Sequence, residues 1–183
     1  MRATLVARAR DGDEAAFESL VDLDGGRCFS IAYRILRDVG MAEDAVQAAL
    51  LRAWAQLPQL RDIERYEVWL KKLLVNACYD ELRRYRRWKD RITVLPIDGL
   101  ASRDPFGSAD DRDALDRAFA RLEPDRRAAF VLHHHAGVPL AEIAEILGLP
   151  LGTVKSRLHY SIEILRAALE ADARGQETEA RGA

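Results

Sequence analysis

The sequence has few cysteines, few aromatic residues and no long hydrophobic run. It contains 183 residues, of which two are cysteine and 7% are aromatic. No segment approaches the ~20 consecutive apolar residues that cross a bilayer, so we expect no membrane insertion. The N-terminal stretch MRATLVARARDGDEAAF lacks the apolar centre of a signal peptide. The protein is therefore expected to stay in the cytoplasm.

The cysteine and histidine content argues against metal and redox chemistry. Cys28 and Cys78 do not form a CxxC pair, so we expect two buried, reduced thiols rather than a disulfide or a metal site. Three consecutive histidines, His133–His135, would point ~100° apart on a helix and could not close on one ion. No nucleophile and base stand at a workable spacing. We predict no metal, no cofactor and no enzymatic activity.

Positive charge is concentrated in one part of a chain whose net charge is only −2. Residues 61–95 contain 10 basic and 6 acidic side chains, whereas residues 96–125 contain 4 and 8. Apolar residues make up 49% of the chain, which is enough for one compact domain or two small ones. A local positive field beside an acidic segment is compatible with nucleic-acid binding despite the overall charge.

The most informative stretch is residues 138–168, VPLAEIAEILGLPLGTVKSRLHYSIEILRAA. Apolar residues recur at helical spacing on both sides of Gly148, which predicts two helices joined by a tight turn. Ala144 is small enough for a close helix crossing, and Gly148 tolerates a left-handed backbone. The second helix offers hydroxyls and positive charge that suit phosphates and base edges, from Thr153, Lys155, Ser156, Arg157, His159 and Tyr160. We predict a DNA-binding helix-turn-helix; the alternative is a helical hairpin with a solvated polar face.

Two helices are expected in the first 57 residues. The segment Glu14–Leu36 is predicted to be helical, with a break at Gly25-Gly26. The segment Met41–Leu57 has one continuous apolar face. A neighbouring face of that second helix carries an acidic, an amide and an apolar side chain at helical spacing, namely Asp44, Gln47 and Leu51. From the residues alone, a solvated helix flank explains this stripe better than a binding surface does.

A basic helix follows a predicted loop at Pro58–Arg65. The helix begins near Tyr66 and ends in ELRRYRRWKDR, where basic residues interleave with Tyr85 and Trp88. Arginine neutralises phosphates, and an aromatic ring can stack on an unpaired base. This pattern favours single-stranded nucleic acid, with a solvated basic face and two packing aromatics as the alternative.

The second half of the chain begins with a predicted linker. Residues 94–113 are rich in Pro, Gly, Ser and Asp and lack helical periodicity. Two further helices are expected at Ala114–Leu122 and Arg126–His135, with Asp125 as the cap of the latter. After Leu169 the sequence is polar and rich in small residues, and we expect a disordered tail.

Two blocks of sequence resemble the RNA polymerase sigma-70 family. EDAVQAALLRAW, a short loop and YEVWLKKLLVNACYDELRRYRRW are similar to its region 2, and LDRAFARLEPDRRAAFVLH followed by TVKSRLHY is similar to its region 4. The absence of anything long before or between them resembles the compact extracytoplasmic-function (ECF) group. The resemblance implies an all-α fold of two small helical domains joined by a flexible linker. It places region 2 at residues 10–92, the linker at 93–113, region 4 at 114–170 and a disordered tail at 171–183.

The resemblance also implies which residues bind core RNA polymerase. In the family the Asp-x-x-Gln helix docks on the clamp helices of the largest subunit, which assigns this role to Asp44 and Gln47, with Leu51 beside them. Region 4 would contact the flap of the second-largest subunit. The family usually has an acidic residue directly after the glutamine and an aromatic two positions further on, where this chain has Ala48 and Leu50.

Promoter contacts follow from the same resemblance. The family loop that captures a base flipped from the minus-10 element corresponds to Pro58–Arg65, and an asparagine that helps to read that base corresponds to Asn76. A carboxamide offers both a donor and an acceptor to a base edge. The implied minus-10 contacts are Leu60, Arg61, Asn76, Arg83, Arg84 and Arg87. The implied minus-35 contacts are Thr153, Lys155, Ser156, Arg157, His159 and Tyr160, and the last stands where the family commonly has arginine.

We therefore expect an ECF-type sigma factor that binds core polymerase and promoter DNA and directs transcription initiation. The resemblance also implies an anti-sigma factor as a partner. The alternative is a LuxR-type helix-turn-helix regulator with an N-terminal sensor domain, which would bind duplex DNA by itself as a dimer. That alternative leaves the Asp44/Gln47 helix and the basic, aromatic segment without a role.

Overall fold

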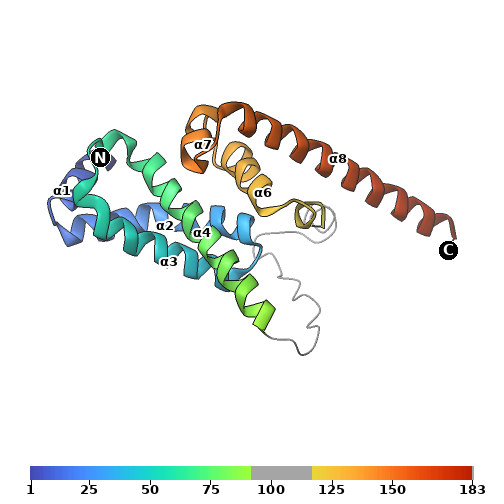
Figure 1. The fold of residues 1–183 in the computed structure, drawn as a ribbon, viewed down its shortest axis with the longest axis horizontal. Coiled ribbons are helices and arrows are strands. Elements are labelled where there is room, and N and C mark those ends of the chain that lie inside the picture. Colours follow the sequence, from blue (N-terminus) through green and yellow to red (C-terminus); the bar gives the residue numbers. More distant parts are fainter. Residues whose placement is uncertain (92–116, 183) are drawn as a thin grey trace.

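The computed structural model describes residues 1–91 and 117–182, with side chains up to residue 171. Within these residues the secondary structure is helical and contains no strand, which confirms the predicted all-α fold. Figure 1 shows the helices α1 to α4 as one bundle and α6, α7 and the start of α8 as a second, smaller one. The long helix α8 extends away from both, so the two chain ends lie far apart (Figure 1).

The first domain is a bundle in which α2, α3 and α4 pack against one another and α1 packs on α2. The carboxylate of Asp13 caps α2 by accepting a hydrogen bond from the backbone N–H of Ala16 at 3.0 Å. The helices and 3₁₀ turns are α1 (Arg2–Arg10), α2 (Glu14–Leu36), α3 (Val39–Gln56), η1 (Leu57–Gln59), η2 (Ile63–Arg65) and α4 (Tyr66–Arg91). The predicted loop at Pro58–Arg65 thus contains two short 3₁₀ turns.

The predicted break in the first long helix is wrong, because α2 runs without interruption through Gly25 and Gly26. Neither glycine has a positive φ. Asp24 and Cys28, which flank them, are buried in the bundle. A glycine in a helix costs only ~1 kcal/mol relative to alanine, and burial of one face over six turns offsets that cost.

The second domain contains α6 (Pro124–Phe130), the π-helical turn η3 (Val131–His135), α7 (Leu140–Leu147) and α8 (Leu151–Gly182). Gly148 ends α7 in the left-handed conformation with φ 64°, which confirms the predicted turn. The predicted cap is wrong: Glu123 occupies the cap position of α6, while Asp125 lies in the first helical turn. Asp125 instead pairs with Arg157 of α8 at 3.3 Å.

Two expectations concern the ends of this domain. The predicted linker, residues 93–113, lies outside the described residues. The tail was expected to be disordered, but α8 continues to Gly182. Alanine, glutamate and arginine dominate this stretch, and their high helix propensity favours continuation of a helix that has already been nucleated.

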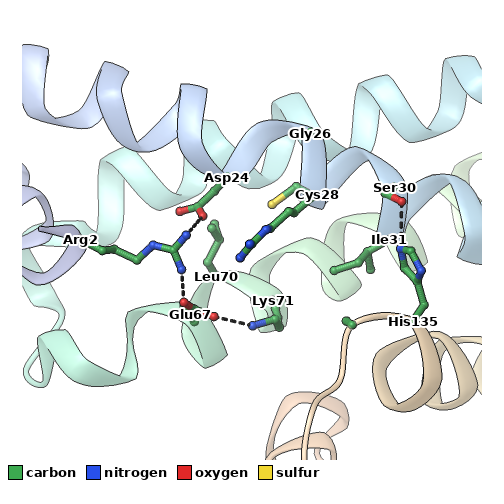
Figure 2. Close-up of a pocket in the computed structure, with 12 residues that line it drawn as sticks. Arg2, Asp24, Gly26, Cys28, Ser30, Ile31, Glu67, Leu70, Lys71 and His135 are labelled. Carbon is green, nitrogen blue, oxygen red and sulfur yellow. Dashed lines mark hydrogen bonds and ion pairs between the residues drawn. The ribbon is translucent and has the colours of Figure 1, made fainter.

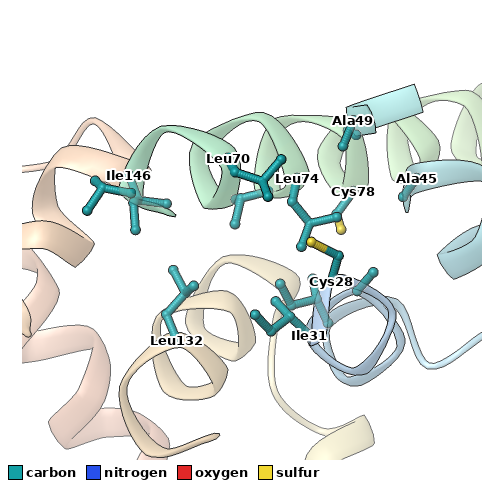
Figure 3. Packing of buried hydrophobic residues seen from close by; sticks show 14 of the residues in the cluster. Cys28, Ile31, Ala45, Ala49, Leu70, Leu74, Cys78, Leu132 and Ile146 are labelled. Carbon is teal, nitrogen blue, oxygen red and sulfur yellow. The ribbon is translucent and has the colours of Figure 1, made fainter. Parts of the chain in front are cut away.

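The two domains share one hydrophobic core, which the sequence analysis did not predict. Helix α7 packs against α4, and α6 and η3 pack against α2. In Figure 3 Ile146 of α7 and Leu132 of η3 face the same core as Leu70 and Ile31 of the first domain. The domains were expected to be held only by a flexible linker, whereas the structure fixes them against each other through buried apolar surface.

A buried arginine joins the domains at this core. Arg127 of α6 is 8% exposed, and its guanidinium donates to the carbonyl oxygen of Ile35 in the first domain at 2.8 Å. It also donates to the carbonyl of Leu122 in its own domain at 2.8 Å. Burial, with a smaller contribution from Arg37, lowers the pKa of Arg127 to about 10, so the side chain is still charged at neutral pH. Its two hydrogen bonds satisfy backbone acceptors at the domain boundary.

Cys28 and Cys78 are free thiols buried in the core, as predicted (Figure 3). Burial raises the pKa of Cys28 to about 11 and that of Cys78 to about 12. Because the thiolate is the reactive form, we expect neither thiol to react with a maleimide or disulfide reagent at pH 8 in the folded protein. Both should react in denaturant, which mass spectrometry would count. Rapid labelling of the folded protein would contradict this assignment.

Candidate functional site

The predicted stripe on α3 is exposed. Asp44 and Gln47 are both solvent-accessible, and Leu51 is 64% exposed although it is apolar. The three side chains follow one another at three- and four-residue spacing, so they share one face of the helix. The opposite face is buried through Ala45 and Ala49. A single exposed leucine is common on protein surfaces, so its significance depends on the apolar area around it.

An apolar groove runs beside this stripe, between α2 and α3. Its volume is about 380 Å³. The rings of Phe17 and Trp54 pack at 5.0 Å between centroids and form part of its wall. The full lining consists of Glu14, Phe17, Glu18, Val21, Gln47, Leu50, Leu51 and Trp54. The sequence did not predict this groove, because a groove between two helices has no signature in the pattern of either helix.

Asn76 lies on the exposed side of α4 and begins a second polar stripe. Asn76, Arg83 and Arg87 are all exposed and follow one another at seven- and four-residue spacing, on one side of α4. Arg83 forms an ion pair with Asp80, and Arg84 pairs with Glu81 at 3.2 Å. Two of the predicted DNA-binding arginines are therefore partly neutralised within their own helix.

The aromatic rings and the loop residues that were predicted near the minus-10 surface do not all lie together. Tyr85 and Trp88 are about half exposed, with ring centroids 6.0 Å apart. Leu60 is half-buried and Arg61 is exposed, and both lie between η1 and η2, before α4 begins. The structure therefore brings Asn76 and the basic residues of α4 together, whereas Leu60 and Arg61 occupy a separate turn.

The first turns of α8 divide into a buried and an exposed side. Val154 and Leu158 are buried, and the half-buried Arg157 pairs with Asp125. Thr153 is half-buried, and its carbonyl accepts a hydrogen bond from the Ser156 hydroxyl at 3.0 Å. The exposed side carries Lys155, Ser156, His159 and Tyr160. Four of the six predicted minus-35 residues thus face solvent together.

The three histidines contact different groups, although the rings of His133 and His134 also touch, with centroids 4.8 Å apart. His133 lies against the carbonyl of Val138 at 3.2 Å through Nδ1, and the ring of His134 packs on Phe130 at 4.4 Å. His135 contacts the hydroxyl of Ser30, in the first domain, at 2.9 Å through Nε2. Burial lowers the pKa of His134 and of His135. His135 therefore adds a polar contact between the domains.

A charged pocket of about 520 Å³ opens beside that contact (Figure 2). Arg2 of α1 bridges Asp24 of α2, at 2.8 Å, and Glu67 of α4, which in turn accepts from Lys71 at 3.1 Å. Asp24 is 5% exposed, and burial raises the pKa of its carboxyl group. One of its oxygens, Oδ2, has no hydrogen-bond partner. This network ties α1, α2 and α4 together, and the sequence contains no motif that predicts it.

Comparisons with known proteins match a family profile to each of the two domains. The family profile of Sigma-70 region 2 matches residues 20–88, and that of Sigma-70, region 4 matches residues 112–161. The ECF RNA polymerase sigma factor SigL of Mycobacterium tuberculosis is 33% identical over 169 residues, which cover 90% of this chain and 95% of SigL. The ECF RNA polymerase sigma factor SigW of Bacillus subtilis is 27% identical over 176 residues, which cover 90% of this chain and 94% of SigW.

A solved structure extends the similarity to the whole fold. The sigma factor RpoE of Bartonella quintana, in complex with the anti-sigma factor NepR, superimposes with a TM-score of 0.71 at 28% identity, over 85% of this chain and 98% of RpoE. The region 2 match lies where a LuxR-type regulator would have its sensor domain, so that alternative is not supported. The chain belongs to the sigma-70 family of RNA polymerase sigma factors, in its extracytoplasmic-function group.

Proposed function

We propose that this sigma factor binds core RNA polymerase through the exposed stripe Asp44, Gln47 and Leu51 together with the apolar groove beside it. The exposed leucine and the groove supply apolar contact area. Gln47 belongs to the stripe and also lines the groove. The carboxylates of Glu14, Glu18 and Asp44 surround this area with negative charge, which suits a helical partner with basic side chains. The clamp helices of the largest polymerase subunit are the partner that the family resemblance implies.

The Asn76 side of α4 is the proposed minus-10 surface, together with Leu60, Arg61, Arg83, Arg84 and Arg87. Its support is the exposure of Asn76 next to basic side chains and the half-exposed rings of Tyr85 and Trp88. An exposed carboxamide can read the edge of an unpaired base, while neighbouring arginines neutralise the strand. The loop before α4 would hold the flipped base.

The exposed side of α8 is the proposed minus-35 surface. Lys155, Ser156, His159 and Tyr160 face outward at the start of a helix that follows a tight left-handed turn, as in DNA-binding helix-turn-helix proteins. Thr153 and Arg157 flank them, and the pairing of Arg157 with Asp125 suits a backbone-directed role better than base reading. The second domain, residues 114–170, would also contact the flap of the second-largest subunit.

The packing of the two domains bears on how both promoter elements are bound. Arg65, in the proposed base-capturing loop, forms an ion pair with Glu145 of α7. While α7 stays on α4, the second domain lies against that loop, so promoter binding requires this contact to open. The RpoE structure contains an anti-sigma factor, NepR. A similar partner of this chain would bind the two packed domains. We place the protein in the cytoplasm with its polymerase and assign it no catalysis of its own.

The decisive experiment is in vitro transcription with purified core RNA polymerase from the source organism, on DNA upstream of the gene for this protein and on fragmented genomic DNA. We expect specific transcripts only when the protein is added. Binding of the same DNA by the protein alone, without initiation, would favour a conventional regulator. The genomic fragments supply promoters even if the gene does not control itself, so absence of any specific transcript would reject the proposal.

Asn76→Ala should impair promoter opening more than polymerase binding. The side chain is exposed, so truncation leaves the core of the first domain intact. We expect the rate of open-complex formation, measured by permanganate footprinting, to fall about tenfold while core affinity stays within twofold, because a good hydrogen-bonded pair with a base edge is worth ~1–3 kcal/mol. Ser19→Ala, at an exposed polar position of α2 outside the proposed binding surfaces, is the control. Equal losses of opening and of core binding would make Asn76 a structural residue.

A further inference from the structure

A guanidinium group from α6 is stacked on the proposed minus-35 surface. The Cζ atom of Arg126 lies 5.7 Å from the centroid of the Tyr160 ring. Tyr160 is 57% exposed and stands one helical turn after Ser156, on the same side of α8. Arg126 belongs to the first turns of α6 and is half-buried. Such a cation–π contact holds the guanidinium at the edge of the exposed α8 side.

The start of α6 is anchored to α8 on both sides of this contact. Asp125 pairs with Arg157 at 3.3 Å, one turn before Tyr160. The buried hydroxyl of Ser161 donates to the carbonyl oxygen of Arg157 at 2.7 Å, and the carbonyl oxygen of Arg126 lies 3.5 Å from the same hydroxyl oxygen. The start of α6 therefore packs closely on α8, where the ion pair of Asp125 holds it, and the tyrosine ring orients the side chain of Arg126. A side chain held in this way loses less conformational entropy when it binds a ligand.

The two arginines at this junction differ in charge balance. Arg157 is partly neutralised by Asp125. Within residues 1–91 and 117–171, Arg126 forms no ion pair, so its positive charge is not compensated. The contact of Cζ with the tyrosine ring leaves guanidinium N–H groups available as donors. A guanidinium that is held against Tyr160 and forms no ion pair is suited to an anion on the DNA.

We propose that Arg126 is a DNA-backbone contact of the minus-35 surface, binding a phosphate group that flanks the bases read by α8, and that Tyr160 is its positioning residue. The inference rests on the proposed function of α8. A phosphate is favoured over a base because Arg126 projects from α6 and not from the helix that would enter the groove, so its side chain approaches the DNA from beside that helix. Half or more of the hydrogen bonds between proteins and DNA are made to phosphate or sugar atoms, and these contacts fix the position of the protein on the duplex.

The test uses the complete sigma factor assembled with core polymerase and a promoter obtained by in vitro transcription. Dissociation constants are measured at several salt concentrations for the wild type, Arg126→Gln and Arg126→Lys. We expect Arg126→Gln to weaken binding about tenfold and to reduce the slope of log K against log salt by about 0.9, the value for one lost phosphate contact. The same loss should occur with every minus-35 sequence. Arg126→Lys should keep the slope.

Tyr160 is tested by a double-mutant cycle. Tyr160→Phe keeps the ring and should keep the slope, whereas Tyr160→Leu should lose affinity by an amount that shrinks in the Arg126→Gln background. Arg121→Gln, at an exposed arginine that precedes α6, is the matched control and should leave the slope unchanged. An unchanged slope for Arg126→Gln would overturn the proposal, and a loss confined to one base pair would replace the phosphate with a base contact. Lys155→Ala tests the proposed function separately: if it also has no effect, α8 itself is not the DNA-binding helix.

Discussion

Leu51→Asp is expected to weaken binding to core RNA polymerase about 100-fold. Leu51 is 64% exposed and lines the groove between α2 and α3, so an aspartate there places an unpaired charge in a surface that would be apolar in the complex. Truncation of a hot-spot residue at the centre of an interface costs ~2 kcal/mol or more, and an unpaired charge buried there adds to that cost. Affinity can be measured by fluorescence anisotropy with labelled protein and purified core enzyme.

A matched variant separates this effect from unfolding. Leu23 is also an exposed leucine, on α2, and does not line the groove. Leu23→Asp should therefore keep core affinity within a few-fold, and both variants should show the circular dichroism and thermal midpoint of the wild type. If Leu51→Asp binds core as tightly as Leu23→Asp, the α3 stripe is not the polymerase-binding surface.

Arg127→Met is expected to lower the free energy of unfolding by about 2–3 kcal/mol. The substitution keeps much of the side-chain volume but leaves the carbonyls of Ile35 and Leu122 without their donor in a buried environment. An unsatisfied buried acceptor costs ~1–3 kcal/mol, which is larger than the net value of an average hydrogen bond. Urea denaturation followed by circular dichroism would give the difference.

The same variant should also loosen the contact between the domains. The substitution removes the hydrogen bond from Arg127 to the Ile35 carbonyl, which joins the second domain to the first. Because this weakens the contact between the domains, we expect a larger radius of gyration by small-angle X-ray scattering. Arg121→Met, at an exposed arginine of the second domain, provides the control and should change neither quantity. A wild-type radius and stability for Arg127→Met would show that the apolar core and the other polar contacts hold the domains together without Arg127.

Local sequence signals determined the helices and the helix-turn-helix. The left-handed Gly148, the outward positions of Asp44, Gln47 and Leu51, and the buried Val154 could all be predicted, because helical period and turn chemistry depend on neighbours in the chain. The resemblance to the sigma-70 family also rested on these linear blocks, and the family was confirmed. The roles of individual residues in binding polymerase and promoter DNA are still predictions.

Only the tertiary structure decided which helix faces meet. The uninterrupted α2, the groove walled by Phe17 and Trp54, the Arg127 bond to Ile35 and the stacking of Arg126 on Tyr160 each depend on residues from different helices. The continuity of α2 depends on packing that outweighs the low helix propensity of two glycines. The remaining three are contacts between segments up to 92 positions apart in the sequence. Such contacts are set by the packing of whole helices in a common core, and no periodicity within a single helix encodes them.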